Sequence, residues 1–150
     1  MRLPPLGGLP GLRRLRNPVI PRRVPRRLLG YRPRRDGRPD PGEVVWAWVP
    51  YEEDPQRGKD RPVLVVGTEG DRLLGLALTS KDHDRDADQE ARAGRVWMDV
   101  GTGAWDARRR PSEVRLNRLL RLAPGDVRRE GAALPREVFD AVLAAAAPYL

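Results

Sequence analysis

The sequence predicts a mainly β domain of the α+β class: a small β-barrel with C-terminal helices that follows a disordered basic tail. Short runs rich in valine, leucine and tryptophan alternate with polar loops from residue 43 onward. Residues 134–150 instead place apolar side chains at helical spacing. Residues 1–40 show neither pattern, because arginine and proline dominate them. We therefore expect a disordered tail over residues 1–40 and one folded domain over residues 41–150.

The composition excludes several classes of protein. A chain of 150 residues has room for one domain with a single core. It has no cysteine and only one histidine, His83, which excludes disulfides, thiolate metal sites and zinc sites built on several histidines. No metal and no cofactor are therefore expected. No apolar run approaches the roughly 20 residues that cross a bilayer, and the N-terminus lacks an apolar signal region. We expect a cytoplasmic protein that does not enter the membrane.

The positive charge belongs to the tail. Residues 1–40 contain twelve arginines, two aspartates and eight prolines, while the whole chain carries a net charge of +8. The remaining residues are therefore close to neutral. Proline breaks helices and like charges repel, so this composition favours disorder. Two interpretations of the tail stay open: an arm that holds nucleic acid in a salt-sensitive way, or an extension without a role.

The first three strands can be read in order. Residues 43–49 (EVVWAWV) alternate and predict a strand, and residues 50–60 carry the proline, glycine and charge of a loop. The β-branched run 61–67 (RPVLVVG) predicts a buried strand, with Pro62 tolerated at its start. Residues 68–72 predict a turn, with Gly70-Asp71 at its tip. The return strand is expected over residues 73–80 (LLGLALTS).

The rest of the chain is less regular. We expect long polar loops at 81–94 and 101–112, a strand at 95–100, and a strand at 113–123 for which a helix stays an alternative. Residues 123–131 are typical of a short helix that begins near Asp126 and ends at Gly131. The final helix is expected within residues 134–150, with Pro135 in its first turn.

The two ends of the predicted hairpin raise a functional question. If strands 61–67 and 73–80 pair, Arg61 at one end meets Thr79 at the other. Arginine offers a planar fork of donors that matches phosphate, and a threonine hydroxyl can donate to another oxygen of the same group. The alternative is structural: Arg61 forms a surface ion pair with Asp60 or Glu113, and the hydroxyl binds local backbone.

Four tryptophans, Trp46, Trp48, Trp97 and Trp105, also allow two interpretations, because aromatic rings hold single-stranded RNA by stacking. Trp46 and Trp48 share one strand face, so we assign one or both to packing or to a dimer interface. Trp105 lies in a glycine-rich loop before three arginines, which favours an exposed ring near RNA. A solvated charged loop is the alternative for that segment.

Four segments together resemble the PemK/MazF family of toxin–antitoxin toxins: PGEVVWAWVPYEED, GKDRPVLVVG, LGLALTSKDHD and PSEVRLNRLLRLAPGDV. Their order and spacing are similar to that family over residues 41–145. The resemblance implies an SH3-like β-barrel, usually a homodimer, that cuts single-stranded mRNA without metal and leaves a 2′,3′-cyclic phosphate. It also implies a cognate antitoxin partner, and promoter DNA as a possible target of the toxin–antitoxin complex.

Residue by residue, the resemblance assigns catalysis to Arg61 and Thr79. Substrate binding is expected from the basic, polar and aromatic residues near them: Arg57, Lys59, Ser80, Lys81 and Trp105. His83 is a possible base because an imidazole can accept a proton near neutral pH. The loop before Arg61 departs from the family, with Gln56 and Arg57 where the family tends toward acidic and polar residues. Glu53 and Asp60 are available carboxylates without an assigned role.

Three function classes follow from these observations. The first is a metal-independent endoribonuclease toxin that uses Arg61 and Thr79 to stabilise the phosphoryl transition state. The second is a non-catalytic barrel that binds DNA or RNA, assisted by the basic tail. The third is a partner-binding module that has kept the fold without the chemistry.

Overall fold

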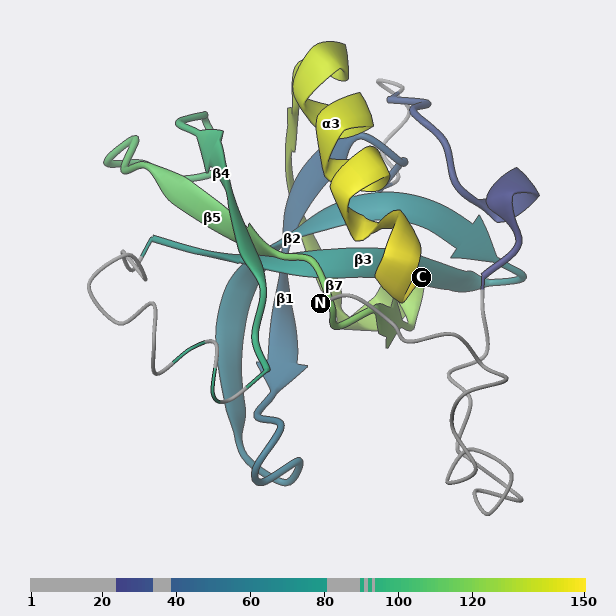
Figure 1. Cartoon of the computed structure of the whole chain (residues 1–150). Coiled ribbons are helices and arrows are strands. Elements are labelled where there is room, and N and C mark those ends of the chain that lie inside the picture. The colour runs from purple at the N-terminus through teal and green to yellow at the C-terminus, as the bar shows by residue number, and fades with distance from the viewer. Residues whose placement is uncertain (1–23, 34–38, 81–89, 91, 93) are drawn as a thin grey trace, which may run out of the picture.

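The computed structural model describes residues 24–33, 39–80, 90, 92 and 94–150. Seven strands and a C-terminal helix dominate this part of the chain (Figure 1). The strands are β1 (Glu43–Pro50), β2 (Gly58–Glu69), β3 (Arg72–Thr79), β4 (Trp97–Gly101), β5 (Ser112–Arg115), β6 (Leu120–Leu122) and β7 (Val127–Ala133). The helices are the 3₁₀ turns η2 (Arg26–Leu28), η4 (Pro124–Asp126) and η5 (Ala147–Tyr149), and the α-helix α3 (Arg136–Ala146).

The described strands form one antiparallel sheet in the order β4-β5-β3-β2-β1-β7, with β6 paired to β3 beside this path. The β2–β3 hairpin turns at Gly70-Asp71 as expected, and Gly70 supplies the positive φ of 61° that a two-residue turn needs. Strands β4 and β7 are left as the two edges, so the sheet does not close within the described residues. The mainly β class with a C-terminal helix is confirmed, whereas the closed barrel is not.

Side chains alternate between two cores, one on each face of the sheet. On one face Val44, Leu64 and Leu76 pack under α3, which contributes Phe139 and Val142. Figure 1 shows α3 lying across β2 and β3 on this face.

The second core lies on the opposite face of the same strands. It includes Val45, Val63 and Ala77, and Leu120 and Leu122 of β6 complete it. Because both faces of β2 and β3 are buried, their sequences read as continuous apolar runs.

The expected single strand over 113–123 is wrong: the chain divides there into β5 and β6. β5 pairs with the C-terminal end of β3, at Leu78 and Thr79, and β6 pairs with its N-terminal end. The division has a packing reason. Leu116 enters the core under α3, whereas Leu120 and Leu122 enter the opposite core, and one straight strand would place all three on one face.

The expected short helix over 123–131 is also wrong. Only the 3₁₀ turn η4 forms, and the chain then continues as β7 along β1. The ladder to β1 satisfies the backbone of this segment and overrides its weak local helix signal. The final helix is confirmed, although α3 occupies only the middle of the expected range, with Pro135 at its N-cap.

Residues 24–33 form a strap against the domain, so the expectation of disorder is wrong for this segment. Leu29 pairs with Gly67, and the Gly30 amide donates to the Val66 carbonyl, where β2 extends beyond β1. Gly67 makes this approach possible, because a Cβ there would overlap the carbonyl of Leu28. The rest of the predicted tail, residues 1–23 and 34–38, lies outside the described residues.

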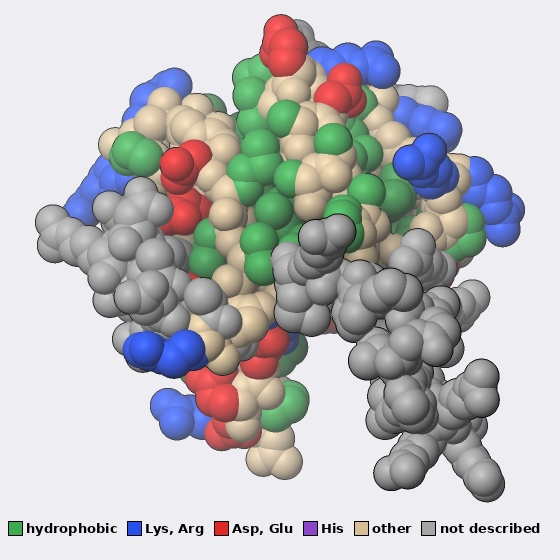
Figure 2. Space-filling model, in the orientation of Figure 1, with side chains coloured by type: hydrophobic (Ala, Val, Ile, Leu, Met, Phe, Trp, Pro, Cys, Tyr) green, Lys and Arg blue, Asp and Glu red, His purple; other side chains and the backbone are tan. Residues whose placement is uncertain are grey.

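The far end of the strap is tied to the C-terminal helix region. The Tyr31 hydroxyl donates to the Leu134 carbonyl at 2.8 Å, and the Tyr31 ring meets Phe139 with centroids 5.3 Å apart. Figure 2 shows hydrophobic side chains gathered along α3 in the middle of this face, with charged side chains mostly toward its margins. In the described part of the chain, no helix is long and apolar enough to cross a membrane.

We predict that Tyr31 stabilises the whole domain. Tyr31→Phe removes one part-buried hydrogen bond and lowers the free energy of unfolding by about 1 kcal/mol. Tyr31→Ala also removes the contact with Phe139, and the loss rises to about 2–3 kcal/mol. Urea denaturation of the full chain measures both values. Arg27→Ala, an exposed position in the same strap, is the control and changes stability by less than about 0.5 kcal/mol. Equal stability of Tyr31→Ala and the wild type would contradict the role of the strap.

Candidate functional site

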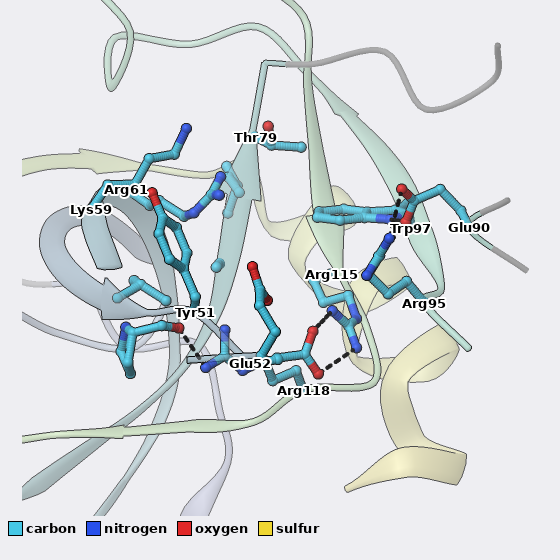
Figure 3. Close-up of a pocket in the computed structure, with 15 residues that line it drawn as sticks. Tyr51, Glu52, Lys59, Arg61, Thr79, Glu90, Arg95, Trp97, Arg115 and Arg118 are labelled. Atoms are coloured by element: carbon cyan, nitrogen blue, oxygen red, sulfur yellow. Dashed lines mark hydrogen bonds and ion pairs between the residues drawn. The ribbon is translucent and has the colours of Figure 1, made fainter. Parts of the chain in front are cut away.

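A pocket of about 410 Å³ opens where the C-terminal end of β1, the start of β2 and the end of β3 come together. Five cationic and three anionic side chains are among its lining residues: Lys59, Arg61, Arg95, Arg115 and Arg118, with Glu52, Glu53 and Glu90. Figure 3 shows the basic residues of β2 on one side of the pocket and those near β4 and β5 on the other. Such a density of charge in a concave site indicates a charged ligand.

The register of β2 and β3 brings Arg61 and Thr79 to this pocket. Val63 pairs with Ala77, and continuing the same register by two residues places Arg61 opposite Thr79. On its other side Arg61 pairs with Ala47 of β1, so the arginine sits in a central strand. Both side chains line the pocket, and the expected meeting of the hairpin ends is confirmed.

Glu52 and Arg115 form an ion pair across the floor of the pocket. The guanidinium of Arg115 donates to both carboxylate oxygens, at 2.6 and 3.2 Å, and its Nε donates to Asn117. Arg115 is buried whereas the Glu52 side chain is 44% exposed. The hydrogen bonds from Arg115 lower the pKa of Glu52, against a smaller opposite effect of burial.

The opposite wall is built around Glu90. This buried carboxylate accepts hydrogen bonds from Arg95 at 2.5 Å and from the indole nitrogen of Trp97 at 3.0 Å. Arg115 lies over the Trp97 ring, 5.9 Å from its centroid. The interactions link this wall to the floor, so that the two arginines and the indole hold fixed positions.

Arg61 and Arg118 differ from these paired arginines. Neither has a carboxylate within ion-pair distance among the described residues, although Arg118 donates to the Pro50 carbonyl at 2.7 Å. Burial is the main cause that lowers the pKa of each, and their charges repel one another. Both remain protonated at neutral pH. A half-buried guanidinium that no carboxylate of the described residues contacts is a ready partner for a phosphate or another anion.

The other predicted binding residues divide into three groups. Lys59 lines the pocket beside Arg61, as expected. Arg57 and Ser80 are exposed next to the pocket but do not line it. Lys81 and His83 lie outside the described residues.

Trp105 is a correction. It was expected to be exposed, and it is 4% exposed within the core under α3. Its indole donates to the Ser112 hydroxyl at 3.1 Å, and its carbonyl accepts from Trp46. The loop folds back over Trp46, so Trp105 presents no ring face to a base. Trp48 is instead the exposed tryptophan of β1, at 46%.

Sequence reasoning missed much of the pocket. Glu52 lies in a predicted loop and meets Arg115, which is 63 positions later in the chain. Arg115 and Arg118 come to the pocket because of the turn between β5 and β6, which the predicted single strand did not contain. Trp97 was noted only as one of four tryptophans. The strand 95–100 gave no local signal that one of its side chains faces a charged pocket.

The comparison with known families confirms the family resemblance that was inferred from the sequence. Residues 40–150 match the family model described as the PemK-like, MazF-like toxin of type II toxin–antitoxin systems. The match therefore includes every described residue of the pocket and stops short of the strap. No significant match is found among curated proteins. Among the described residues, no three metal-ligating side chains lie close enough together to hold a metal ion.

We predict that Glu52→Gln destabilises the protein by leaving the buried Arg115 without its counter-charge. The expected loss is about 1–2 kcal/mol at pH 7, discounted because Glu52 is partly exposed. The lowered pKa of Glu52 gives the sign of the pH dependence. The stabilisation is complete above the usual value of about 4.5 and is lost as the pH falls through the lower pKa of the folded state. Urea denaturation at pH 7 and pH 3 measures the difference, which shrinks at pH 3.

Asp60→Asn is the matched control for this prediction. Asp60 pairs with Arg128 at 3.0 Å, but both side chains are at least half exposed. Its neutralisation is expected to change stability by less than about 0.5 kcal/mol. If Glu52→Gln and Asp60→Asn lowered the free energy of unfolding by similar amounts, the burial of Arg115 would not strengthen the Glu52–Arg115 ion pair.

Proposed function

The chain belongs to the PemK-like, MazF-like toxins of type II toxin–antitoxin systems, and we propose that it is a metal-independent endoribonuclease that cleaves single-stranded mRNA. The 2′-hydroxyl of the substrate attacks the adjacent phosphorus, and the bond from phosphorus to the 5′-oxygen breaks. The products are a 2′,3′-cyclic phosphate and a 5′-hydroxyl. Negative charge grows on the non-bridging oxygens during this step, so an enzyme accelerates it by placing donors around them.

The observation that supports the proposal is that Arg61 of β2 and Thr79 of the neighbouring β3 both line the pocket. Arg61 is half buried and lacks a carboxylate partner among the described residues, so its charge is available to the substrate phosphate. Its planar guanidinium has donors for both non-bridging oxygens of the phosphodiester, and the hydroxyl of Thr79 adds a further donor to one of them. Because both lie on paired strands, their separation is set by the sheet and not by a loop.

The neighbouring residues suit the backbone of a longer RNA. Lys59 and Arg118 line the same pocket and bind phosphates on either side of the scissile bond. The exposed Arg57 and Ser80 extend this contact along the strand. In this arrangement the RNA crosses the open end of β2, and its sequence is read by groups beyond Arg61 and Thr79.

The family also implies an antitoxin partner. We propose that an acidic segment of the antitoxin competes with RNA for the basic pocket. A homodimer and binding of the toxin–antitoxin complex to promoter DNA complete the proposal. Each of these is tested separately from cleavage, by sedimentation and by DNA binding with and without the antitoxin.

The first test is cleavage of a single-stranded RNA in the presence of EDTA. The full chain is expected to cut and to leave a 2′,3′-cyclic phosphate, which mass spectrometry identifies. Arg61→Ala lowers kcat by about 10²–10³-fold, because a donor to the developing charge is lost. Thr79→Val lowers kcat by about tenfold or more. The full chain is the correct protein for this assay, because residues 24–33 belong to the packed structure.

Arg72→Ala is the matched control, since Arg72 is exposed at the opposite end of the same hairpin. It is expected to cleave like the wild type. Absence of cleavage by the folded wild type would reject the nuclease proposal and favour a protein that only binds nucleic acid or an antitoxin. Equal cleavage by Arg61→Ala and the wild type would reject the assigned site.

A further inference from the structure

We infer that Glu53 is the general base that removes the proton from the attacking 2′-hydroxyl, an inference that rests on the proposed nuclease function. Neither Arg61 nor Thr79 can accept this proton at neutral pH, because arginine stays protonated and a threonine hydroxyl is a very weak base. A metal-independent reaction therefore needs another acceptor beside the phosphate. Three of the described residues that line the pocket carry a carboxylate, and their environments are different.

Two of the three carboxylates are engaged. Glu52 accepts two hydrogen bonds from Arg115, which lower its pKa and make it a poor proton acceptor. Glu90 is buried and accepts from Arg95 and Trp97, so its oxygens serve the wall of the pocket. Removing Glu52 would take the counter-charge from the buried Arg115, and removing Glu90 would take a hydrogen-bond acceptor from Arg95 and from the Trp97 indole, which indicates a positioning role for both.

Glu53 is in a different position. It lines the pocket and is exposed, and it has no hydrogen bond or ion pair with any residue that the structure describes. It stands one residue after Glu52, whose pairing with Arg115 anchors this part of the loop. Its carboxylate oxygens are therefore free to approach a substrate hydroxyl.

Several arginines of the pocket lie close enough to Glu53 to interact with its charge. Arg61 is half buried, and burial is the first cause of its lowered pKa, while the charge of Glu53 acts in the opposite direction. The same balance holds at Arg118. The charge of Glu53 also contributes to the raised pKa of Arg95, which lies in the loop before β4, although the hydrogen bond to Glu90 is the largest cause. Glu53 thus lies within electrostatic range of arginines from three segments without being bound to any of them. The other titratable groups among the described lining residues are Lys59, Tyr51, Glu52, Glu90 and Arg115.

The step balances as an acid–base reaction. The proton of the 2′-hydroxyl moves to a carboxylate oxygen of Glu53 while the 2′-oxygen forms its bond to phosphorus. The bond to the 5′-oxygen breaks, and that oxygen takes a proton from solvent. Glu53 returns its proton to solvent before the next turnover. Arg61 stabilises the charge on the phosphoryl oxygens, so base and electrophile act on the same phosphate.

The test compares Glu53→Gln with the wild type in the EDTA cleavage assay with full-length chains. Glutamine keeps the size of the side chain but cannot accept the proton, so kcat is expected to fall about 10²–10⁴-fold with little change in KM. Glu53→Ala is expected to regain part of its activity in added formate, which supplies a carboxylate to the vacated space. Glu137→Gln makes the same change at an exposed position of α3 and is expected to retain full activity.

The outcomes separate this inference from the function on which it rests. Cleavage by the wild type with kcat of Glu53→Gln within about threefold of it overturns the role of Glu53 alone. A loss of activity in Glu53→Ala that formate does not restore, with KM raised in place of kcat, also overturns it, since it shows a binding role. No cleavage by the folded wild type overturns both proposals. A fall in kcat with formate rescue and unchanged thermal stability supports the assignment.

Discussion

The antiparallel register between β2 and β3 is the constraint on which the rest of this structure depends. It aligns the two apolar runs so that alternate side chains enter two separate cores, one under α3 and one on the opposite face. The same register carries Arg61 and Thr79 past the ends of these cores to the edge of the pocket. A slip of one residue would turn the side chains of one strand to the opposite face of the sheet and break the packing of both cores. One strand register therefore determines both the packing of the cores and the position of the site residues.

The pocket separates two tasks that charged residues perform. Glu52 and Glu90 neutralise Arg115 and Arg95 and fix the floor and the wall. Arg61 and Arg118 are partly withdrawn from water without that neutralisation. Within the described residues no carboxylate contacts either of them, and a positive charge that has lost hydration without such a contact raises the free energy of the site, which an anionic ligand lowers. The paired residues hold the framework in which the unpaired ones remain exposed to a ligand.

Much of the framework could be predicted from local pattern. The hairpin, its Gly70 turn and the C-terminal helix each have a signal within about a dozen residues of sequence. The chain at 113–123 did not, because its division depends on which of two cores each leucine enters, and one sequence cannot show that a second core exists. Trp105 was misjudged for a related reason: its burial comes from contacts with Trp46 and Ser112, not from its own polar neighbours. Arg61 and Thr79 were identified from family resemblance and strand ends, whereas the Glu52–Arg115 pair had no local signal.

The strap of residues 24–33 lies outside the stretch that matches the family, yet it is part of the folded unit. The family match therefore leaves out residues that pack against the domain. A fragment trimmed to the limits of the family match would leave the β2 backbone beyond β1 without its partner and would uncover apolar surface beside α3. Such an open edge recruits other strands, often from a second copy. Self-association of that fragment would then result from the exposed strand edge and would not reflect the assembly of the native protein.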